Sequence, residues 1–158
     1  MTRIVTSAVI AATPAAVWRV ASDLAAQPDW MRDAHTIRFV SMQTSGVGVV
    51  MDCDTRIGPI RLTDRMVVTE WVAGRTIAIR HQGLVSGTGR FTIEPDWAGT
   101  RFTWSEDLRF PWALGGPVSA AAARPVLAAI WRRDLSRLRM LAEAAAAPAQ
   151  DAGQRSTP

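Results

Sequence analysis

The segment "GTRFTWSEDLRFPW" (residues 99–112) decides the fold, because it alternates between apolar and polar positions and marks the end of a sheet. One set of alternate positions is aromatic or aliphatic: Phe102, Trp104, Leu108 and Phe110. Alternate side chains of a strand point to opposite faces, so this set is expected to face a core. Glu106 is in phase with it, which places a carboxylate on the core face.

Upstream of this segment, residues 46–110 keep a period close to two, interrupted by turn signals at short intervals. The strands expected there are 48–57, 60–72, 75–82, 86–95 and 100–110. Consecutive short hairpins predict one antiparallel meander. Two further strands, expected at 3–11 and 36–42, bring the sheet to seven strands.

Helices are expected on either side of the meander. Thr13 followed by Pro14 is typical of a helix start, and this helix should end near Asp23. A second short helical piece at 24–31 is broken by a proline. After "FPWALGGP" (110–117) the apolar period becomes helical. The stripe of the terminal helix comprises Leu127, Trp131, Leu135 (or Asp134), Leu138 and Leu141.

Two boundaries follow from the terminal segment. Pro125 is expected to kink the terminal helix or to split off a first piece at 117–124. The domain is expected to span residues 1–146 as one unit. Residues 147–158 lack hydrophobic anchors and are expected to be a disordered tail.

This order of elements predicts an α+β fold in which a twisted antiparallel sheet buries one face against a long helix. It resembles the helix-grip fold of the START and birch-pollen-allergen-like superfamily, and most of all the bacterial polyketide cyclase/dehydrase and lipid transport (SRPBCC) proteins. The resemblance spans residues 3–145 and rests on the segments 12–23 ("ATPAAVWRVASD"), 58–71 ("GPIRLTDRMVVTEW"), 80–91 ("RHQGLVSGTGRF"), 99–112 and 124–141 ("RPVLAAIWRRDLSRLRML"). It implies a curved seven-stranded sheet wrapped around a long C-terminal helix, with two short helices after the first strand. Such proteins often leave a cavity between sheet and helix.

Three polar residues are expected on the inner face of the sheet. His81 is in phase with apolar neighbours on its strand, and Asp64 is in phase with Met66. Short turns would place Phe91 opposite Trp104, Gly89 opposite Glu106, His81 near Gly89 and Asp64 near Cys53. His81 and Glu106 would then converge over Gly89. A bulge in "LTDRM" (62–66) would instead turn Asp64 outward.

A ligand cavity with few polar groups is therefore predicted. Its expected lining is Asp64, Met66, Ile79, His81, Gly89, Phe91, Trp104, Glu106, Leu127 and Trp131. His81 and Glu106 are the candidate catalytic residues, with His81 as the base and Glu106 as its partner. The alternatives are a buried structural pair and a pair that orients a ligand.

Other features have simpler interpretations. Cys53 is expected to be a small core residue. Residues 110–117 are a connector or a gate over the cavity mouth. The face formed by Arg132, Arg133, Arg137 and Arg139 is expected to be solvated, and the alternative is weak contact with an anionic surface. No metal site or organic cofactor is implied.

Composition bounds the function class. The chain has 158 residues and a formal net charge of +4, which gives little reason to expect specific nucleic-acid binding. A single cysteine excludes an intramolecular disulfide. No apolar run is long enough to span a membrane, so a cytoplasmic protein is expected.

The leading hypothesis is binding or carriage of a hydrophobic small molecule, such as a lipid or polyketide, between the sheet and the terminal helix. Catalysis is a second hypothesis, implied by the resemblance: an aromatase/cyclase that uses His81 and Glu106 for acid–base chemistry. A third, also from the resemblance, is a toxin-like protein or one that associates with ribosomes or quinones through the arginine face. The sequence leaves open whether any reaction occurs and which oligomeric state forms.

Overall fold

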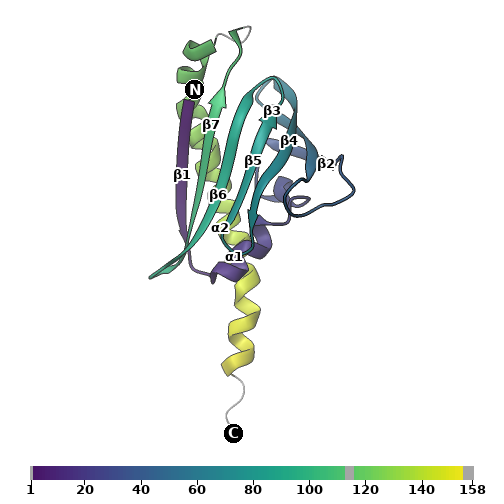
Figure 1. The fold of residues 1–158 in the computed structure, drawn as a ribbon. Helices are drawn as coiled ribbons and strands as arrows, with labels where there is room; N and C mark the ends of the chain where they lie inside the picture. The colour runs from purple at the N-terminus through teal and green to yellow at the C-terminus, as the bar shows by residue number, and fades with distance from the viewer. Residues whose placement is uncertain (1, 113–115, 155–158) are drawn as a thin grey trace.

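The computed structural model describes residues 2–112 and 116–154. Seven strands form one antiparallel sheet in the order β1-β7-β6-β5-β4-β3-β2. The elements are β1 (Thr2–Ile10), α1 (Pro14–Ala21), η1 (Gln27–Asp29, a 3₁₀ turn), β2 (Ala34–Phe39), β3 (Val50–Ile57), β4 (Ile60–Val72), β5 (Thr76–Gln82), β6 (Ser86–Asp96), β7 (Gly99–Arg109) and α2 (Gly116–Gln154). The predicted α+β fold, with a curved sheet and a long C-terminal helix, is confirmed (Figure 1).

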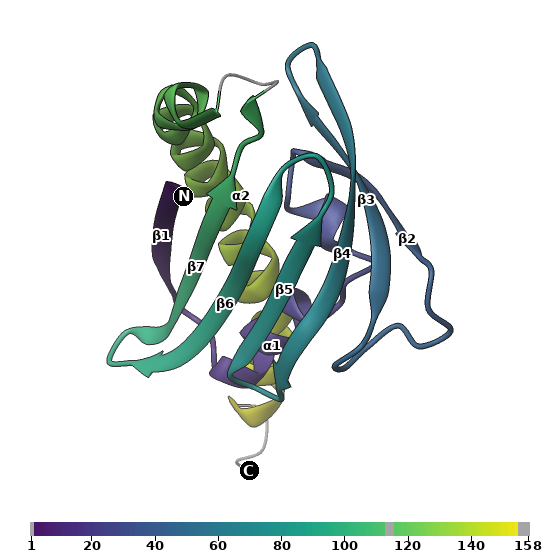
Figure 2. The same ribbon diagram turned by 45° about the horizontal axis from the view of Figure 1, so that its top comes forward.

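The sheet curls around the long helix, as Figure 2 shows from a second direction. Along its length α2 packs against β1, β7 and α1. The predicted start of α1 is confirmed, because the side chain of Thr13 accepts a hydrogen bond from the backbone N–H of Ala16 and Pro14 begins the helix. The second expected helical piece is reduced to η1.

An aromatic cluster joins the helix to the sheet. Trp30, which follows η1, is fully buried and lies edge-on to Trp104 with a centroid separation of 6.0 Å. Trp104 in turn stacks on Trp131 of α2 at 4.7 Å. Phe91 and Phe102 complete the cluster from β6 and β7. The core therefore extends continuously from the meander to the terminal helix.

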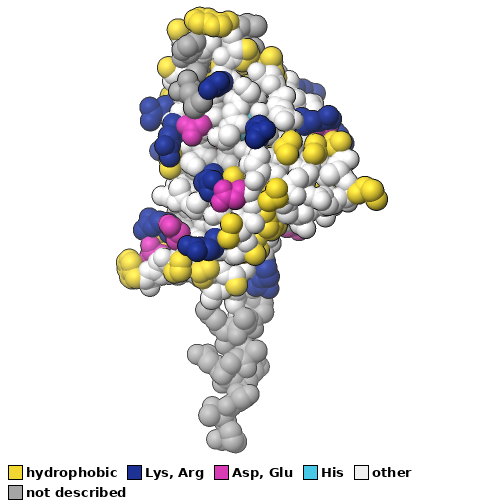
Figure 3. Space-filling view, in the orientation of Figure 1, with side chains coloured by type: hydrophobic (Ala, Val, Ile, Leu, Met, Phe, Trp, Pro, Cys, Tyr) yellow, Lys and Arg dark blue, Asp and Glu magenta, His cyan; other side chains and the backbone are white. Residues whose placement is uncertain are grey.

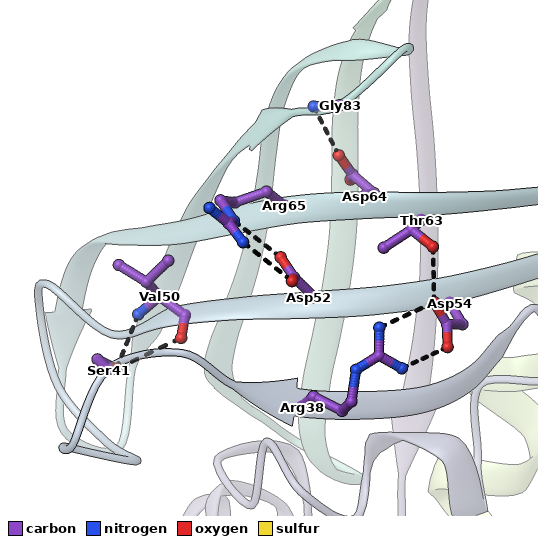
Figure 4. A network of polar contacts seen from close by, with 9 residues as sticks. All are labelled: Arg38, Ser41, Val50, Asp52, Asp54, Thr63, Asp64, Arg65 and Gly83. Atoms are coloured by element: carbon purple, nitrogen blue, oxygen red, sulfur yellow. Dashed lines mark hydrogen bonds and ion pairs between the residues drawn. The ribbon is translucent and has the colours of Figure 1, made fainter.

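The two faces of the sheet differ as the alternation predicts. On the outer face, Arg38 pairs with Asp54 and Arg65 pairs with Asp52 across neighbouring strands (Figure 4). The hydrogen bonds from Arg38 and Thr63 lower the pKa of Asp54 to about 2. Arginine and carboxylate side chains are distributed over this face of the molecule (Figure 3). Such exposed pairs contribute little to stability but keep the outer face polar.

Some expected boundaries are wrong. The second strand is Ala34–Phe39, so it begins and ends earlier than the predicted 36–42. α2 is one helix across Pro125, so the expected split into a first piece at 117–124 is wrong, and the alternative of a kink stays a prediction. Pro125 and Ala121 are exposed, so solvent can hydrogen-bond the carbonyl that a proline leaves free.

The remaining expectations concern the ends and the connector. α2 continues to Gln154, beyond the expected domain boundary at residue 146, and residues 155–158 of the expected disordered tail lie outside the described residues. The predicted connector or gate falls partly on 113–115, which also lie outside them. Within the described ranges, no helix combines the length and the hydropathy that crossing a membrane requires.

Candidate functional site

A cavity of about 550 Å³ lies between the inner face of β3–β7 and the N-terminal half of α2. Every residue predicted to line a cavity does so: Asp64, Met66, Ile79, His81, Gly89, Phe91, Trp104, Glu106, Leu127 and Trp131. Whether these residues contact a ligand stays a prediction. Most of the wall is aliphatic or aromatic, so the polar side chains stand out.

A hydrogen-bonded cluster of Asp64, His81 and Glu106 forms the main polar point of this wall. His81 Nδ1 contacts Asp64 Oδ2, and His81 Nε2 lies 3.0 Å from Glu106 Oε2. These three side chains come from β4, β5 and β7. We call them the His81 cluster.

Both carboxylates have further donors. Trp104 Nε1 donates to Glu106 Oε1 at 2.8 Å. The backbone N–H of Gly83 donates to Asp64 Oδ1 at 2.9 Å (Figure 4). Each carboxylate oxygen of the cluster therefore has a hydrogen-bond partner, as buried charged groups require.

The position of His81 between two carboxylates sets its charge. Burial by itself lowers the pKa of His81, but the hydrogen bonds with Asp64 and Glu106 outweigh burial and raise it to about 10. At neutral pH His81 is thus an imidazolium whose two N–H groups both donate. It can hold or donate a proton, whereas the predicted role as a free base requires prior loss of that proton.

Glycine makes the cluster possible. A Cβ at position 89 would lie 2.4 Å from Glu106 Oε1, so the Glu106 carboxylate occupies the space above Gly89. A Cβ at Gly83 would lie 2.4 Å from Asp64 Oδ1. Both glycines provide room for a carboxylate that a side chain would displace.

The register is partly as expected. Phe91 lies opposite Trp104, and Gly89 lies opposite Glu106, as predicted. Asp64 lies opposite Cys53, also as predicted. The expected place of His81 near Gly89 is wrong by two residues: His81 pairs with Gly87, and Ile79 pairs with Gly89.

The bulge considered at 62–66 does not occur there. The irregularity of β4 lies between Val68 and Glu70, beyond the cluster. Asp64 therefore stays in phase with Met66 and points inward. His81 and Glu106 still meet despite the register error, because they reach toward each other across β6, where Gly87 and Gly89 carry no side chain.

A second pair of carboxyl groups, Asp33 and Asp134, was missed by sequence reasoning. Asp33 lines the cavity and accepts a hydrogen bond from Trp131 Nε1 at 3.4 Å. Asp134 on α2 is fully buried and accepts from the backbone N–H of Arg32 at 3.1 Å. The only available signal was the choice between Leu135 and Asp134 in the stripe of the terminal helix, and both residues are in fact buried.

The two carboxyl groups are buried near each other, and Asp33 Oδ1 and Asp134 Oδ2 have no hydrogen-bond partner among the described residues. Burial raises the pKa of Asp134 to about 7, and burial raises the pKa of Asp33 as well. Asp33 and Asp134 are referred to below as the carboxyl pair.

The remaining points from the sequence concern Cys53, metal binding and the arginine face of α2. Cys53 is buried, and burial raises the pKa of its thiol to about 11, so it does not supply a thiolate. Among residues 2–112 and 116–154, no group of three or more His, Cys, Asp or Glu side chains is arranged to hold a metal ion. The predicted anionic contact through Arg132, Arg133, Arg137 and Arg139 is untested and stays a prediction.

Comparison with protein families identifies the chain. The family described as polyketide cyclase/dehydrase and lipid transport matches residues 1–143. The chain belongs to this family. Comparison with curated protein sequences finds no match.

Solved structures agree on the fold. The di-domain ARO/CYC StfQ of the steffimycin biosynthetic pathway is similar at a TM-score of 0.75 and 15% identity, over 90% of this chain and 50% of that one. TTHA0849 from Thermus thermophilus gives a TM-score of 0.69 at 15% identity, over 93% and 98%. Protein CV1439 from Chromobacterium violaceum gives 0.66 at 18% identity, over 90% and 99%. At these identities the likeness shows the shared fold alone.

The space above Gly89 can be tested by filling it. Gly89→Ala is expected to displace the Glu106 carboxylate from His81 and so lower the pKa of His81 by about one unit or more. The measurement is an NMR titration of the His81 ring between pH 6 and pH 11. Thr88→Ala, an exposed neighbour on β6, is the control. An unchanged His81 titration in Gly89→Ala would contradict this account.

The carboxyl pair predicts a pH dependence of stability. Because the folded pKa of Asp134 is raised above 3.8, its contribution is fully present below about pH 4 and is lost as pH rises through about 7. Asp134→Asn keeps an oxygen that accepts the hydrogen bond from Arg32 and has no titrating proton. Its Tm relative to the parent chain is expected to rise between pH 5 and pH 8 by roughly 3–8 °C.

Thermal unfolding of both proteins at several pH values provides the measurement. Asp29→Asn, at an exposed carboxylate, is the control. A Tm difference between Asp134→Asn and the parent chain that stays constant with pH would contradict the raised pKa of Asp134.

Proposed function

We propose that the chain binds a hydrophobic small molecule in the cavity between the sheet and α2. The observation that carries this proposal is the cavity itself: about 550 Å³, with a mostly apolar wall and one converging polar cluster. Pockets for small organic ligands have this size and this composition. Family membership supports the same class of ligand.

The cavity has an apolar entrance. Ile60, Leu84 and Val126 line it, and each is more than half exposed. They lie at the β3–β4 turn, the β5–β6 turn and the N-terminal half of α2, respectively. Exposed apolar side chains around an opening are typical of a route for an apolar ligand.

A space-filling substitution tests the proposal. Ala123 lines the cavity, whereas its neighbour Ala122 is exposed and does not. Ala123→Phe is expected to weaken binding of the neutral fluorescent probe N-phenyl-1-naphthylamine about tenfold or more, and Ala122→Phe is expected to leave it unchanged. Titration of probe fluorescence measures both. Equal affinities in the two variants would place the probe elsewhere and count against the cavity.

Catalysis is the second candidate, and the His81 cluster is the observation that favours it. The imidazolium of His81 lies in the wall of an apolar cavity, so a carbonyl oxygen of a folded poly-β-ketone that replaced Glu106 as its partner would receive the Nε2 proton. Such an acid assists ring closure and water loss. The name of the matched family includes this chemistry.

This candidate predicts different effects of substitution at the two histidines. His81→Gln is expected to abolish cyclisation of a synthetic poly-β-ketone thioester while keeping probe binding, since the glutamine amide donates hydrogen bonds but does not transfer a proton as an acid. His35→Gln, at an exposed position on β2, is expected to change neither. Product formation followed by mass spectrometry provides the measurement. If cyclisation is no faster with the parent chain than without protein, the catalytic candidate is wrong and binding alone remains.

A further inference from the structure

The charged groups around the cavity are mostly acidic. Asp33, Asp64 and Glu106 line it, and the basic residues among the described lining are His81 and Arg90. Both ring nitrogens of His81 are already taken by carboxylates. The His81 cluster therefore contains two carboxyl groups and one imidazole ring, so its acidic groups outnumber its basic one.

Arg90 does not offset this excess of acidic groups in the cavity lining. Its guanidinium bonds Glu70 with contacts of 2.5 and 3.2 Å, and nearly half of its side chain is exposed. It alternates on β6 with Gly89 and Phe91, which face the cavity, so its side chain points to the outer face. Within the described lining, no cation is left for an anionic ligand.

The indole N–H groups of the cavity wall already donate to carboxylates. Trp104 donates to Glu106, and Trp131 donates to Asp33. The amide of Gln27 and the hydroxyl groups of the wall donate or accept equally and do not discriminate. A separate depression of about 180 Å³, which Asp33 also lines, is bordered by Arg32, Arg56 and Arg133.

We propose that the cavity selects hydrophobic molecules whose polar end donates hydrogen bonds, binding protonated amines ahead of alcohols and excluding free carboxylates. This inference rests on the proposed function and specifies its ligand class. An ammonium or hydroxyl group can donate to the carboxylate oxygens of the wall. A carboxylate would be buried beside like charges with no partner, which is strongly unfavourable.

The overall charge of the chain predicts the opposite order. A formal net charge of +4 attracts anions in general. A preference for amines would therefore come from the cavity and not from the surface, which makes the order of affinities informative.

The test compares dodecylammonium, dodecanol and dodecanoate at pH 7 as competitors for bound N-phenyl-1-naphthylamine. The expected result is at least tenfold tighter binding of the ammonium than of the carboxylate, with the alcohol between them. Dodecanoate binding as tightly as dodecanol, or equal affinities for all three, would overturn the selectivity while leaving the proposed function intact. If neither the probe nor any of the three binds, the proposed function itself fails.

A charge-removing variant links the selectivity to the cavity. Glu106→Gln is expected to reduce the ratio of ammonium to dodecanol affinity several-fold. Glu94→Gln, at an exposed position of β6, is the matched control and should leave the ratio unchanged. Asp64→Asn gives an independent second measurement should Glu106→Gln not fold. An ammonium preference that survives in folded Glu106→Gln and Asp64→Asn alike would place its origin outside the His81 cluster and overturn the inference.

Discussion

A buried imidazolium between two carboxylates is the constraint on which the inner face of the sheet depends. Removal of His81 would leave Asp64 and Glu106 as like charges in an apolar wall, at a cost of several kcal/mol. The cluster also requires the missing side chain at Gly89 and the indole N–H of Trp104. One polar contact therefore restricts residue types on β4, β5, β6 and β7 together.

The position of the helix is set separately, by aromatic packing. Trp104 contacts Glu106 through its N–H and Trp131 of α2 through its ring, so it joins the polar cluster to the helix interface. α2 is held along β1, β7 and α1. The inner faces of β4, β5 and β6 contribute instead to the cavity wall. The helix thus bounds the cavity without filling it.

The fold and most of the cavity wall could be predicted from the sequence, because the two-residue period assigns each strand residue to one face of the sheet. It also predicted the pairing of Gly89 with Glu106, since both strands are joined by one short turn. The place of His81 was wrong by two residues: β5 and β6 pair from Gln82 and Ser86, as the expected strand ends imply, and this register puts His81 opposite Gly87. Asp33 and Asp134 were missed for different reasons. Asp33 lies outside any periodic segment, and a helical period cannot decide between adjacent positions such as Asp134 and Leu135.

The two candidate functions make a common demand on the ligand. A keto oxygen only accepts hydrogen bonds, and the strong donors of the wall are already engaged with carboxylates. An enol or phenol hydroxyl donates, so the acidic wall favours the enol form of a poly-β-ketone over its keto form. Enolisation is also what carbon–carbon ring closure requires of one partner. A wall that selects donors for binding would thus stabilise the reactive tautomer. The imidazolium of His81 would supply the proton for the carbonyl that is attacked only where that carbonyl displaces Glu106 from Nε2.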